Sequence, residues 1–264
     1  MRAVAQHRIT YAAAIEKDMP EFLLDCADRE PLAIGATIDA VEGRAAIEQI
    51  GLAVGALGLL VLSACVPSPP PAPVPNGDVM PGITTRGQWG ARPFACSQVD
   101  YAPKLKFAVV HHTVNSNGYG PGASPAIVRA IQAYQLDALG YCDIAYNFLV
   151  DRYGQIFEGR AGGMDRPVIG GHAGGFNTAS TGVALIGDYT SINAPGPQWN
   201  SLVHLLRWRL SVARINPAAG FTTTVLSSPC NCQRWPVGTV ISLPSAIVGH
   251  RDVDQTACPG NTLY

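Results

Sequence analysis

The chain has 264 residues, which is enough for one good-sized domain with additional segments. Its 18 lysines and arginines stand against 19 aspartates and glutamates, and this near balance argues against a nucleic-acid partner, because such partners bind strongly basic proteins. With 47% hydrophobic residues, the chain carries ample apolar side chains for a packed core.

The front of the chain contains a segment typical of export. Residues 1–49 have mixed charge and no repeat or chemical motif, whereas residues 50–62 are uncharged and apolar. That run suits the hydrophobic region of a signal peptide and is short for a membrane span of about 20 residues. It leads into Leu62-Ser63-Ala64-Cys65, which resembles a bacterial lipobox. We expect residues 50–65 to be a signal with lipidation at Cys65, or a membrane anchor; a buried core helix is the alternative.

The position of this segment is unusual, since signal peptides begin at the N-terminus. Either translation starts downstream of Met1, so that residues 1–49 are not made or are cleaved off, or the run stays as an uncleaved anchor. Both readings place the rest outside the cytoplasm, as a lipoprotein on the outer face of the cytoplasmic membrane or as a secreted protein. Residues 66–82 are proline-rich and predict a semi-rigid tether of roughly 3 Å per residue, or a ligand for a proline-binding protein.

Residues 83–264 are predicted to form the folded domain. Trp89, in the opening segment 83–93, is expected to pack in the core, and the apolar run 106–112 is typical of a buried strand that ends in two histidines. Ser124-Pro125 is a good helix start, with Ser124 as N-cap. Apolar residues at helical spacing follow it, and Gly140 supplies the signal that ends the helix. The apolar face would hold Ile127, Ile131, Tyr134 and Ala138, and the solvent-facing side Gln135 and Asp137.

A hairpin and a further strand come next. Residues 144–150 and 155–158 predict two strands joined by the turn 151–154, and residues 181–187 predict another buried strand. The glycine-rich loop 170–177 lets backbone approach a ligand closely.

A long amphipathic helix is predicted over 199–213, followed by a loop-rich stretch over 221–244. Arg207, Arg209 and Arg214 fall off the apolar face of that helix, and His204 is expected at its surface.

Residues 83–244 contain four cysteines, an even number, which in an exported domain favours disulfides. They are Cys96, Cys142, Cys230 and Cys232. Three connectivities are open, of which we prefer Cys96 with Cys142 and Cys230 with Cys232; a second, cysteine-rich metal site is the alternative.

The segment 249–260 contains His250 and Cys258, two good zinc ligands. A third candidate comes from the pair His111 and His112, of which only one can point to a given face of a strand. Two histidines and one cysteine leave a tetrahedral zinc one open position for water, as in a hydrolytic site. Taken singly, each residue also fits a role outside metal binding: the histidines could face solvent, and the cysteine could be buried or disulfide-bonded.

Several blocks in this order resemble the peptidoglycan recognition protein and type 2 N-acetylmuramoyl-L-alanine amidase family, whose bacterial members depend on zinc. The blocks are Val109-Val110-His111-His112-Thr113, Asp143 to Val150, Glu158-Gly159-Arg160, Gly171-His172 with Asn177, and Gly249-His250-Arg251-Asp252 through Cys258-Pro259-Gly260. The resemblance covers roughly residues 83–264. It implies an α/β fold, a mixed and mostly parallel central sheet of about five or six strands with helices on both sides.

The resemblance also implies the roles of the site residues. One Zn²⁺ per chain would be held by His111, His250 and Cys258, with His111 preferred to His112 on the resemblance alone, and His112 facing away to orient the loop or core. Tyr146 would be catalytic, with Thr256 in an assisting role. The contacts to substrate would come from Thr113, His172 and Asn177.

The implied activity is a zinc-dependent N-acetylmuramoyl-L-alanine amidase, acting as a monomer on peptidoglycan at the amide between N-acetylmuramic acid and L-alanine. A non-catalytic peptidoglycan receptor of the same fold is the alternative; such receptors typically lose the metal cysteine, which here is Cys258. A structural or adhesion domain held together by zinc is a further alternative from another class.

Overall fold

The computed structural model describes residues 79–264. The expectations for residues 1–49, for the segment 50–65 with lipidation at Cys65, and for the tether up to residue 78 lie outside the described residues. Within residues 79–264, every helix is too short or too polar to cross a membrane.

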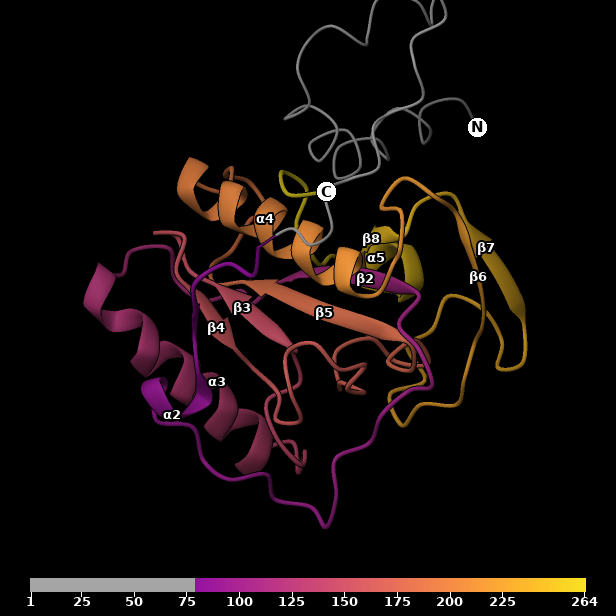
Figure 1. The fold of residues 1–264 in the computed structure, drawn as a ribbon, viewed down its shortest axis with the longest axis horizontal. Coiled ribbons are helices and arrows are strands. Elements are labelled where there is room, and N and C mark those ends of the chain that lie inside the picture. The colour runs from indigo at the N-terminus through magenta and orange to yellow at the C-terminus, as the bar shows by residue number, and fades with distance from the viewer. Residues whose placement is uncertain (1–78) are drawn as a thin grey trace, which may run out of the picture. The chain divides into compact units, whose positions relative to one another are not determined.

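A six-stranded sheet forms the centre of the domain (Figure 1). The strand order is β1-β4-β3-β5-β2-β8, and all neighbours are parallel except the hairpin of β3 and β4. Its strands are β1 (Ile83–Thr84), β2 (Phe107–His112), β3 (Phe148–Val150), β4 (Ile156–Glu158), β5 (Ser180–Leu185) and β8 (Ile247–Gly249). This mixed, mostly parallel α/β sheet confirms the predicted fold.

Helices cover both faces of the sheet, as predicted (Figure 1). Helix α4 (Gly196–Val212) packs on one face, while α2 (Arg86–Trp89) and α3 (Ser124–Asp137) lie on the other. The remaining elements are the turn η2 (Pro121–Ala123), the hairpin of β6 (Phe221–Thr224) and β7 (Val240–Leu243), and the short helix α5 (His250–Val253).

The alternation along β2 divides the core into two sides. Ala108 and Val110 pack toward α4, whereas Phe107 and Val109 face the β6–β7 hairpin. His111 follows Val109 on that second face, and its register partner on β5 is Ala184, which belongs to the α3 cluster. His111 therefore lies where the β6–β7 side of the core meets the α3 side.

The buried face of α3 differs from the predicted one. Its buried residues are Ser124, Val128, Gln132 and Gln135, and Tyr134 is 60% exposed. Gln135 is buried because its Oε1 accepts a hydrogen bond from the backbone N–H of Ala145, so the expected solvent-facing role was wrong. Ser124 is not the N-cap, which is Ala123; instead its hydroxyl donates to Asp151 Oδ2 at 2.6 Å.

Helix α4 follows the predicted apolar face, with Leu202, Leu206 and Leu210 buried. Arg209, expected off that face, is 2% exposed, and its Nη2 donates to the carbonyl of Arg166 at 2.8 Å. Burial lowers the pKa of Arg209 to about 10. His204 is exposed, as predicted.

Two stretches differ from the predicted strands. The strand expected over 144–150 is shortened to β3, because side chains satisfy the backbone before it: the N–H of Ile144 donates to Asp143 Oδ1 and that of Ala145 to Gln135 Oε1, both at 2.8 Å. The stretch 221–244, expected as loops, contains the antiparallel β6–β7 hairpin, whose strands alternate between more and less exposed residues.

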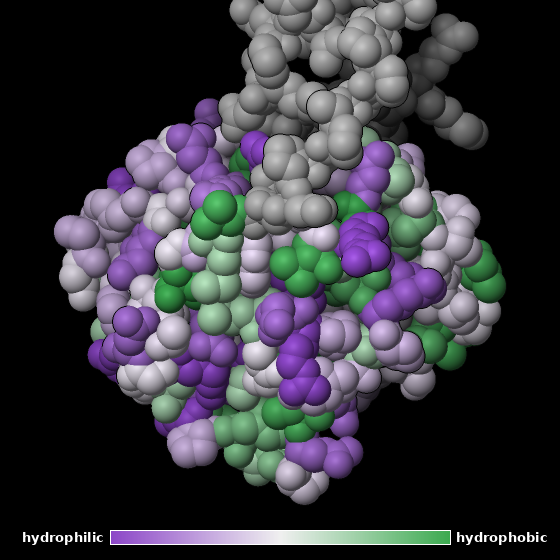
Figure 2. All heavy atoms as spheres, in the orientation of Figure 1, coloured by the Kyte–Doolittle hydropathy of each residue, from purple (hydrophilic) through white to green (hydrophobic). Residues whose placement is uncertain are grey.

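The disulfides are Cys96–Cys142 and Cys230–Cys232, which confirms the preferred pairing. Trp89 is fully buried and its indole N–H donates to the carbonyl of Glu158, so it is a packing residue. On the face of the molecule seen in Figure 2, hydrophobic residues lie in several small groups between hydrophilic ones, as expected for a domain whose larger apolar side chains are mostly inside.

Candidate metal centre

His111 is held in place by the centre of the sheet. It lies on β2, between β5 and β8, and only 1% of its surface is exposed. His112 points to the opposite face, where its Nδ1 accepts a hydrogen bond from the backbone N–H of Tyr189 at 3.2 Å. The alternation thus directs His111 toward the candidate centre and turns His112 away, as expected.

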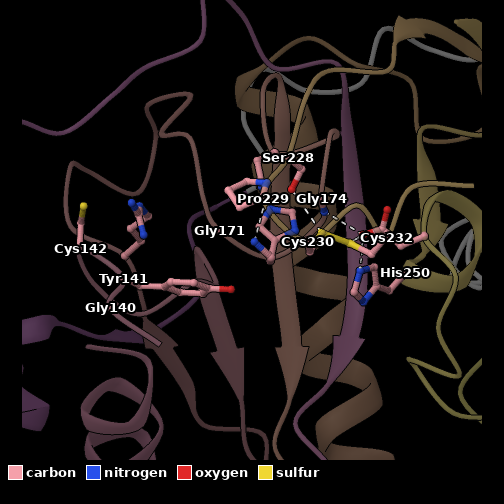
Figure 3. A pocket seen from close by; sticks show the side chains of 14 residues that line it. Gly140, Tyr141, Cys142, Gly171, Gly174, Ser228, Pro229, Cys230, Cys232 and His250 are labelled. Carbon is pink, nitrogen blue, oxygen red and sulfur yellow. Dashed lines mark hydrogen bonds and ion pairs between the residues drawn. A yellow bond between two sulfur atoms is a disulfide. The ribbon is translucent and has the colours of Figure 1, made fainter. Parts of the chain in front are cut away.

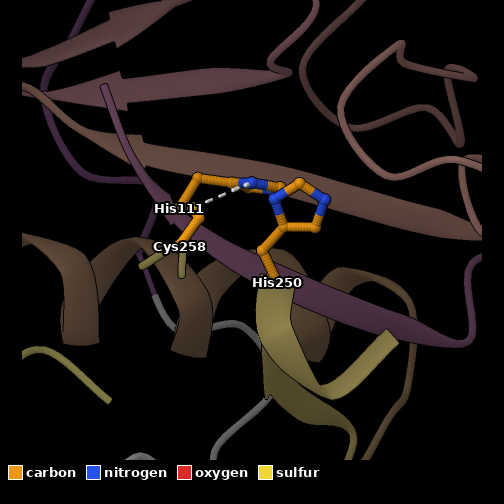
Figure 4. A group of neighbouring side chains, drawn as sticks. All are labelled: His111, His250 and Cys258. Atoms are coloured by element: carbon orange, nitrogen blue, oxygen red, sulfur yellow. Dashed lines mark hydrogen bonds between the residues drawn. The ribbon is translucent and has the colours of Figure 1, made fainter. Parts of the chain in front are cut away.

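His250 and Cys258 reach the same place from the end of the chain (Figure 4). The register of β2 with β8 pairs Val110 with Gly249, so His250 follows beside His111, with the ring centroids 4.4 Å apart. Cys258 Sγ accepts from the N–H of His112 at 3.4 Å and lies 3.7 Å from His111 Nδ1. One ligand atom from each of the three residues lies within 4.8 Å of the other two. The predicted ligand set is therefore brought together.

The outer ring nitrogen of each histidine has its own partner. His111 Nε2 lies 3.1 Å from His172 Nδ1, and His250 Nε2 lies 2.9 Å from Asp254 Oδ2. With Nε2–H as the donor in both rings, Nδ1 of each keeps its lone pair. Metal-binding histidines usually donate their other N–H in this way, so the donors present fit a zinc ion.

Burial controls the charge of these groups. It lowers the pKa of His111 well below its usual value, with a further contribution from the nearby His250, and lowers the pKa of His172 to about 3, so both imidazoles are neutral at pH 7. Burial also raises the pKa of the Cys258 thiol to about 12. A bound cation would reverse that last effect, because it stabilises the thiolate that metal coordination requires.

His172 lies behind His111 rather than on an open surface. It is 6% exposed, and its ring packs so closely on β5 that a Cβ atom on Gly182 would lie 2.4 Å from it. Asn177 holds the same loop, since its Oδ1 accepts from the N–H groups of His172 and Ala173 at 2.7 and 2.8 Å. Both residues also line the pocket described below.

Tyr146 lies beside the metal centre, with its ring centroid 5.3 Å from that of His111. Burial, followed by the proximity of Cys258, raises the pKa of its phenol, which is therefore protonated at neutral pH. Its hydroxyl makes no hydrogen bond to any residue in the range 79–264. A buried packing tyrosine usually has a satisfied hydroxyl, so this one is available to a ligand.

The hydroxyls of the two predicted threonines accept hydrogen bonds from backbone N–H groups. Thr256 is exposed, and its Oγ1 accepts from the N–H of Cys258 at 3.1 Å, which shapes the turn before the ligand. Thr113 Oγ1 accepts from the N–H of Gly187 at 3.1 Å. Each hydroxyl keeps its own hydrogen for donation.

A pocket of about 440 Å³ adjoins the centre (Figure 3). Tyr141 and Cys142 lie on one side of it and the Cys230–Cys232 disulfide with His250 on the other. Arg160 also lines it, and its Nε is buried without a partner among the described residues. Its Nη1 donates to the carbonyl of Ile144 at 3.3 Å, and the guanidinium carbon lies 5.4 Å from the centroid of the Phe94 ring. The pocket therefore borders the metal centre at His250 and carries a guanidinium.

Two residues of this site were not predicted from the sequence. Asp254 stands four positions after His250, a spacing that brings side chains together across one helical turn and could have signalled the contact. Arg160 belongs to the Glu158-Gly159-Arg160 motif, but no local pattern in the sequence shows that its guanidinium lies beside a pocket.

Comparison with known proteins agrees with the geometry. The family model described as N-acetylmuramoyl-L-alanine amidase matches residues 101–261. Peptidoglycan-recognition protein SC2 of Drosophila simulans is 31% identical over 182 residues, covering 69% of this chain and 82% of that protein. Peptidoglycan recognition protein 1 of Rattus norvegicus is 30% identical over 183 residues, covering 69% and 83%.

Solved structures show the same fold. Drosophila PGRP-LB is 25% identical with a TM-score of 0.54, covering 69% of this chain and 90% of that one. Human PGRP-IβC, solved in complex with glycosamyl muramyl pentapeptide, is 27% identical with a TM-score of 0.54, covering 70% and 93%. The chain thus belongs to the family of peptidoglycan recognition proteins and N-acetylmuramoyl-L-alanine amidases.

Proposed function

We propose that the protein is a zinc-dependent N-acetylmuramoyl-L-alanine amidase that hydrolyses the amide between N-acetylmuramic acid and L-alanine of the peptidoglycan stem peptide. The observation that carries the proposal is the meeting of His111, His250 and Cys258, with ligand atoms within 4.8 Å of one another, beside a pocket. Three ligands leave one position of a tetrahedral zinc site for water or substrate, as in hydrolytic enzymes.

The zinc ion, when bound, supplies a Lewis acid that polarises a carbonyl and lowers the pKa of a water to about 7. His111, His250 and Cys258 would hold it. His172 and Asp254 keep the two imidazoles in the tautomer with Nε2–H, so that Nδ1 faces inward. The His172 ring packs closely on Gly182 of β5, and this packing limits rotation of the ring that holds His111 Nε2.

Tyr146 is the residue that meets the charge formed during hydrolysis. Attack on the amide carbon places negative charge on the carbonyl oxygen, which needs a hydrogen-bond donor. The phenol of Tyr146 is protonated and its hydroxyl has no partner among residues 79–264, so it can donate to that oxygen. Thr256, which is exposed and accepts from the N–H of Cys258, would assist with its own hydroxyl hydrogen.

The pocket offers the remaining contacts to substrate. Asn177 and Arg160 line it, and Arg160 makes no ion pair with a residue in the described part of the chain. Thr113 does not line the pocket and is a separate candidate for a substrate contact, with its hydroxyl hydrogen available for donation. A partly buried guanidinium favours an anionic partner, and a stem peptide carries carboxylates. The relative solved with a muramyl pentapeptide supports peptidoglycan as the ligand of this fold.

The proposal extends to location and assembly. We place the domain outside the cytoplasm, at the cell envelope, either tethered through residues 66–82 and a lipid on Cys65 or secreted, and acting as a monomer. The two disulfides support an oxidising compartment.

The test is release of stem peptide from purified peptidoglycan by the full chain, followed by mass spectrometry. We expect release with zinc, loss after chelation, recovery on adding zinc back, and loss in His250→Ala. His204→Ala, which removes an exposed histidine of α4, is the matched control and should keep full activity.

A peptidoglycan receptor is the second candidate, since the relatives compared above are named recognition proteins. Cys258 in the ligand set favours the enzyme over the receptor. Zinc-loaded protein that binds peptidoglycan tightly but releases no stem peptide would decide for the receptor. A zinc-stapled structural domain would instead unfold on chelation and bind no peptidoglycan.

A further inference from the structure

The two candidate ligand histidines have unlike outer partners. His111 is paired with the neutral imidazole of His172, whereas His250 is paired with the carboxylate of Asp254. Asp254 is 1% exposed, and no lysine or arginine forms an ion pair with it among the described residues. Burying a carboxylate without a cationic side chain destabilises the folded state. The position of Asp254 beside a candidate metal ligand therefore suggests a function for its charge.

Asp254 contacts His250 through both its side chain and its backbone. Its Oδ2 accepts from His250 Nε2 at 2.9 Å and from the N–H of Gly174 at 2.8 Å, and its own N–H donates to the carbonyl of His250 at 3.0 Å. Its Oδ1 is buried with no partner in the described part of the chain. One oxygen of the carboxylate therefore has two hydrogen-bond partners, and the other has none among the described residues.

We infer that Asp254 is a positioning residue for the metal centre, acting through His250; this rests on the proposed zinc site. Its carboxylate holds His250 in the Nε2–H tautomer and fixes the ring rotation, which leaves Nδ1 for the ion. The negative charge also makes the imidazole a stronger donor and offsets part of the charge of a dication. The partly unsatisfied carboxylate is then most favourable when the metal is bound.

The Cys230–Cys232 disulfide packs beside this carboxylate. Cys232 Sγ lies 3.6 Å from Asp254 Oδ2, and both sulfurs pack on Gly174, where a Cβ atom would lie 2.3 Å from Cys230 Sγ. Only glycine lets the backbone N–H at 174 reach Asp254 under the disulfide. A dry environment strengthens the hydrogen bond from His250.

The test is zinc affinity, measured on the full chain by competition with a chromophoric chelator. We expect Asp254→Ala to lose roughly 10–100-fold in affinity. Asp254→Asn should lose less, because its amide oxygen can still accept from His250 but carries no charge. Asp151→Asn is the matched control: Asp151 is also fully buried, but it holds Ser124 and the turn at 153–155, so this variant should lose stability and keep its zinc affinity.

Two further readouts separate positioning from folding. Nitrogen NMR of the His250 ring should show the Nε2–H tautomer in the wild type and a mixture in Asp254→Asn, and the visible spectrum of the Co²⁺-loaded variant should shift. If both Asp254 variants fold and bind zinc within about threefold of the wild type, where an outer partner should cost at least tenfold, the inference is overturned. If the wild type itself binds no zinc, the proposed function falls with it.

Discussion

The two halves of the candidate centre are held by different means. His111 is part of β2, with hydrogen-bonded strands on both sides, and its position follows from the sheet. His250 begins the short helix α5 and Cys258 lies in the turn after it, and the shape of this part of the chain depends on individual polar contacts. Arg251 donates from its backbone N–H to the carbonyl of Cys258 and from its side chain to the carbonyl of Ala257.

This difference predicts where the site is vulnerable. A strand inside a sheet shares its position with many backbone hydrogen bonds, so one side-chain change rarely moves it. A segment held by a few polar contacts loses geometry when one of them is removed, because the metal site needs its donors within a fraction of an ångström. Substitutions of equal size should therefore act differently in the two halves.

The largest effect is expected for Cys258→Ser, which removes a ligand from the loop half. The variant should lose more zinc affinity than the roughly 10–100-fold that an outer partner costs, together with stem-peptide release. Chelator competition measures the first and mass spectrometry the second. Undiminished zinc binding by this variant would remove Cys258 from the ligand set.

Tyr146→Phe tests the chemistry without touching either half. Loss of one donor to a developing oxyanion should lower turnover by about 10²–10³-fold while zinc affinity stays unchanged. Tyr134→Phe, on the exposed side of α3, is the matched control and should leave turnover unchanged. A Tyr146 variant with full turnover would make the residue a packing group only.

Gly182→Ala probes the strand half through its outer partner. The new Cβ would lie 2.4 Å from the His172 ring, so the ring must shift, and its contact with His111 Nε2 changes with it. We expect a loss of about 1–3 kcal/mol in unfolding free energy and roughly 10–100-fold in zinc affinity. Gly122→Ala, where a Cβ meets nothing within 4 Å, is the control. An unchanged zinc affinity would show that His111 does not need His172.

The disulfides give the smallest expected effect on the site and the sharpest contrast. Cys96–Cys142 spans 46 residues and Cys230–Cys232 spans 2, so loop entropy predicts a stabilisation of about 4 kcal/mol for the first and under about 2 kcal/mol for the second. Replacing the first pair by serine should lower stability and spare zinc affinity. Replacing the second should lower zinc affinity by less than about tenfold, since it only loosens the cover of an outer partner. A larger loss of zinc affinity on replacing Cys96–Cys142 than on replacing Cys230–Cys232 would contradict the role proposed for the second disulfide.

Local patterns in the sequence determined a large part of this protein. Apolar runs and helical spacing predicted β2, α3 and α4 nearly to their ends, because backbone periodicity repeats in the residue order. The ligand types and their motif blocks indicated His111, His250 and Cys258, and the even cysteine count favoured the two disulfides that the structure contains.

The tertiary structure decided which polar side chains are buried and what they contact. Gln135 and Arg209 looked solvent-facing from their spacing, yet each is buried because a distant carbonyl or N–H needs it. The pairing of His111 with His172 and of His250 with Asp254 likewise arises from packing between segments. A buried polar group is stable only with a partner, and that partner is chosen by the three-dimensional arrangement rather than by the neighbouring sequence.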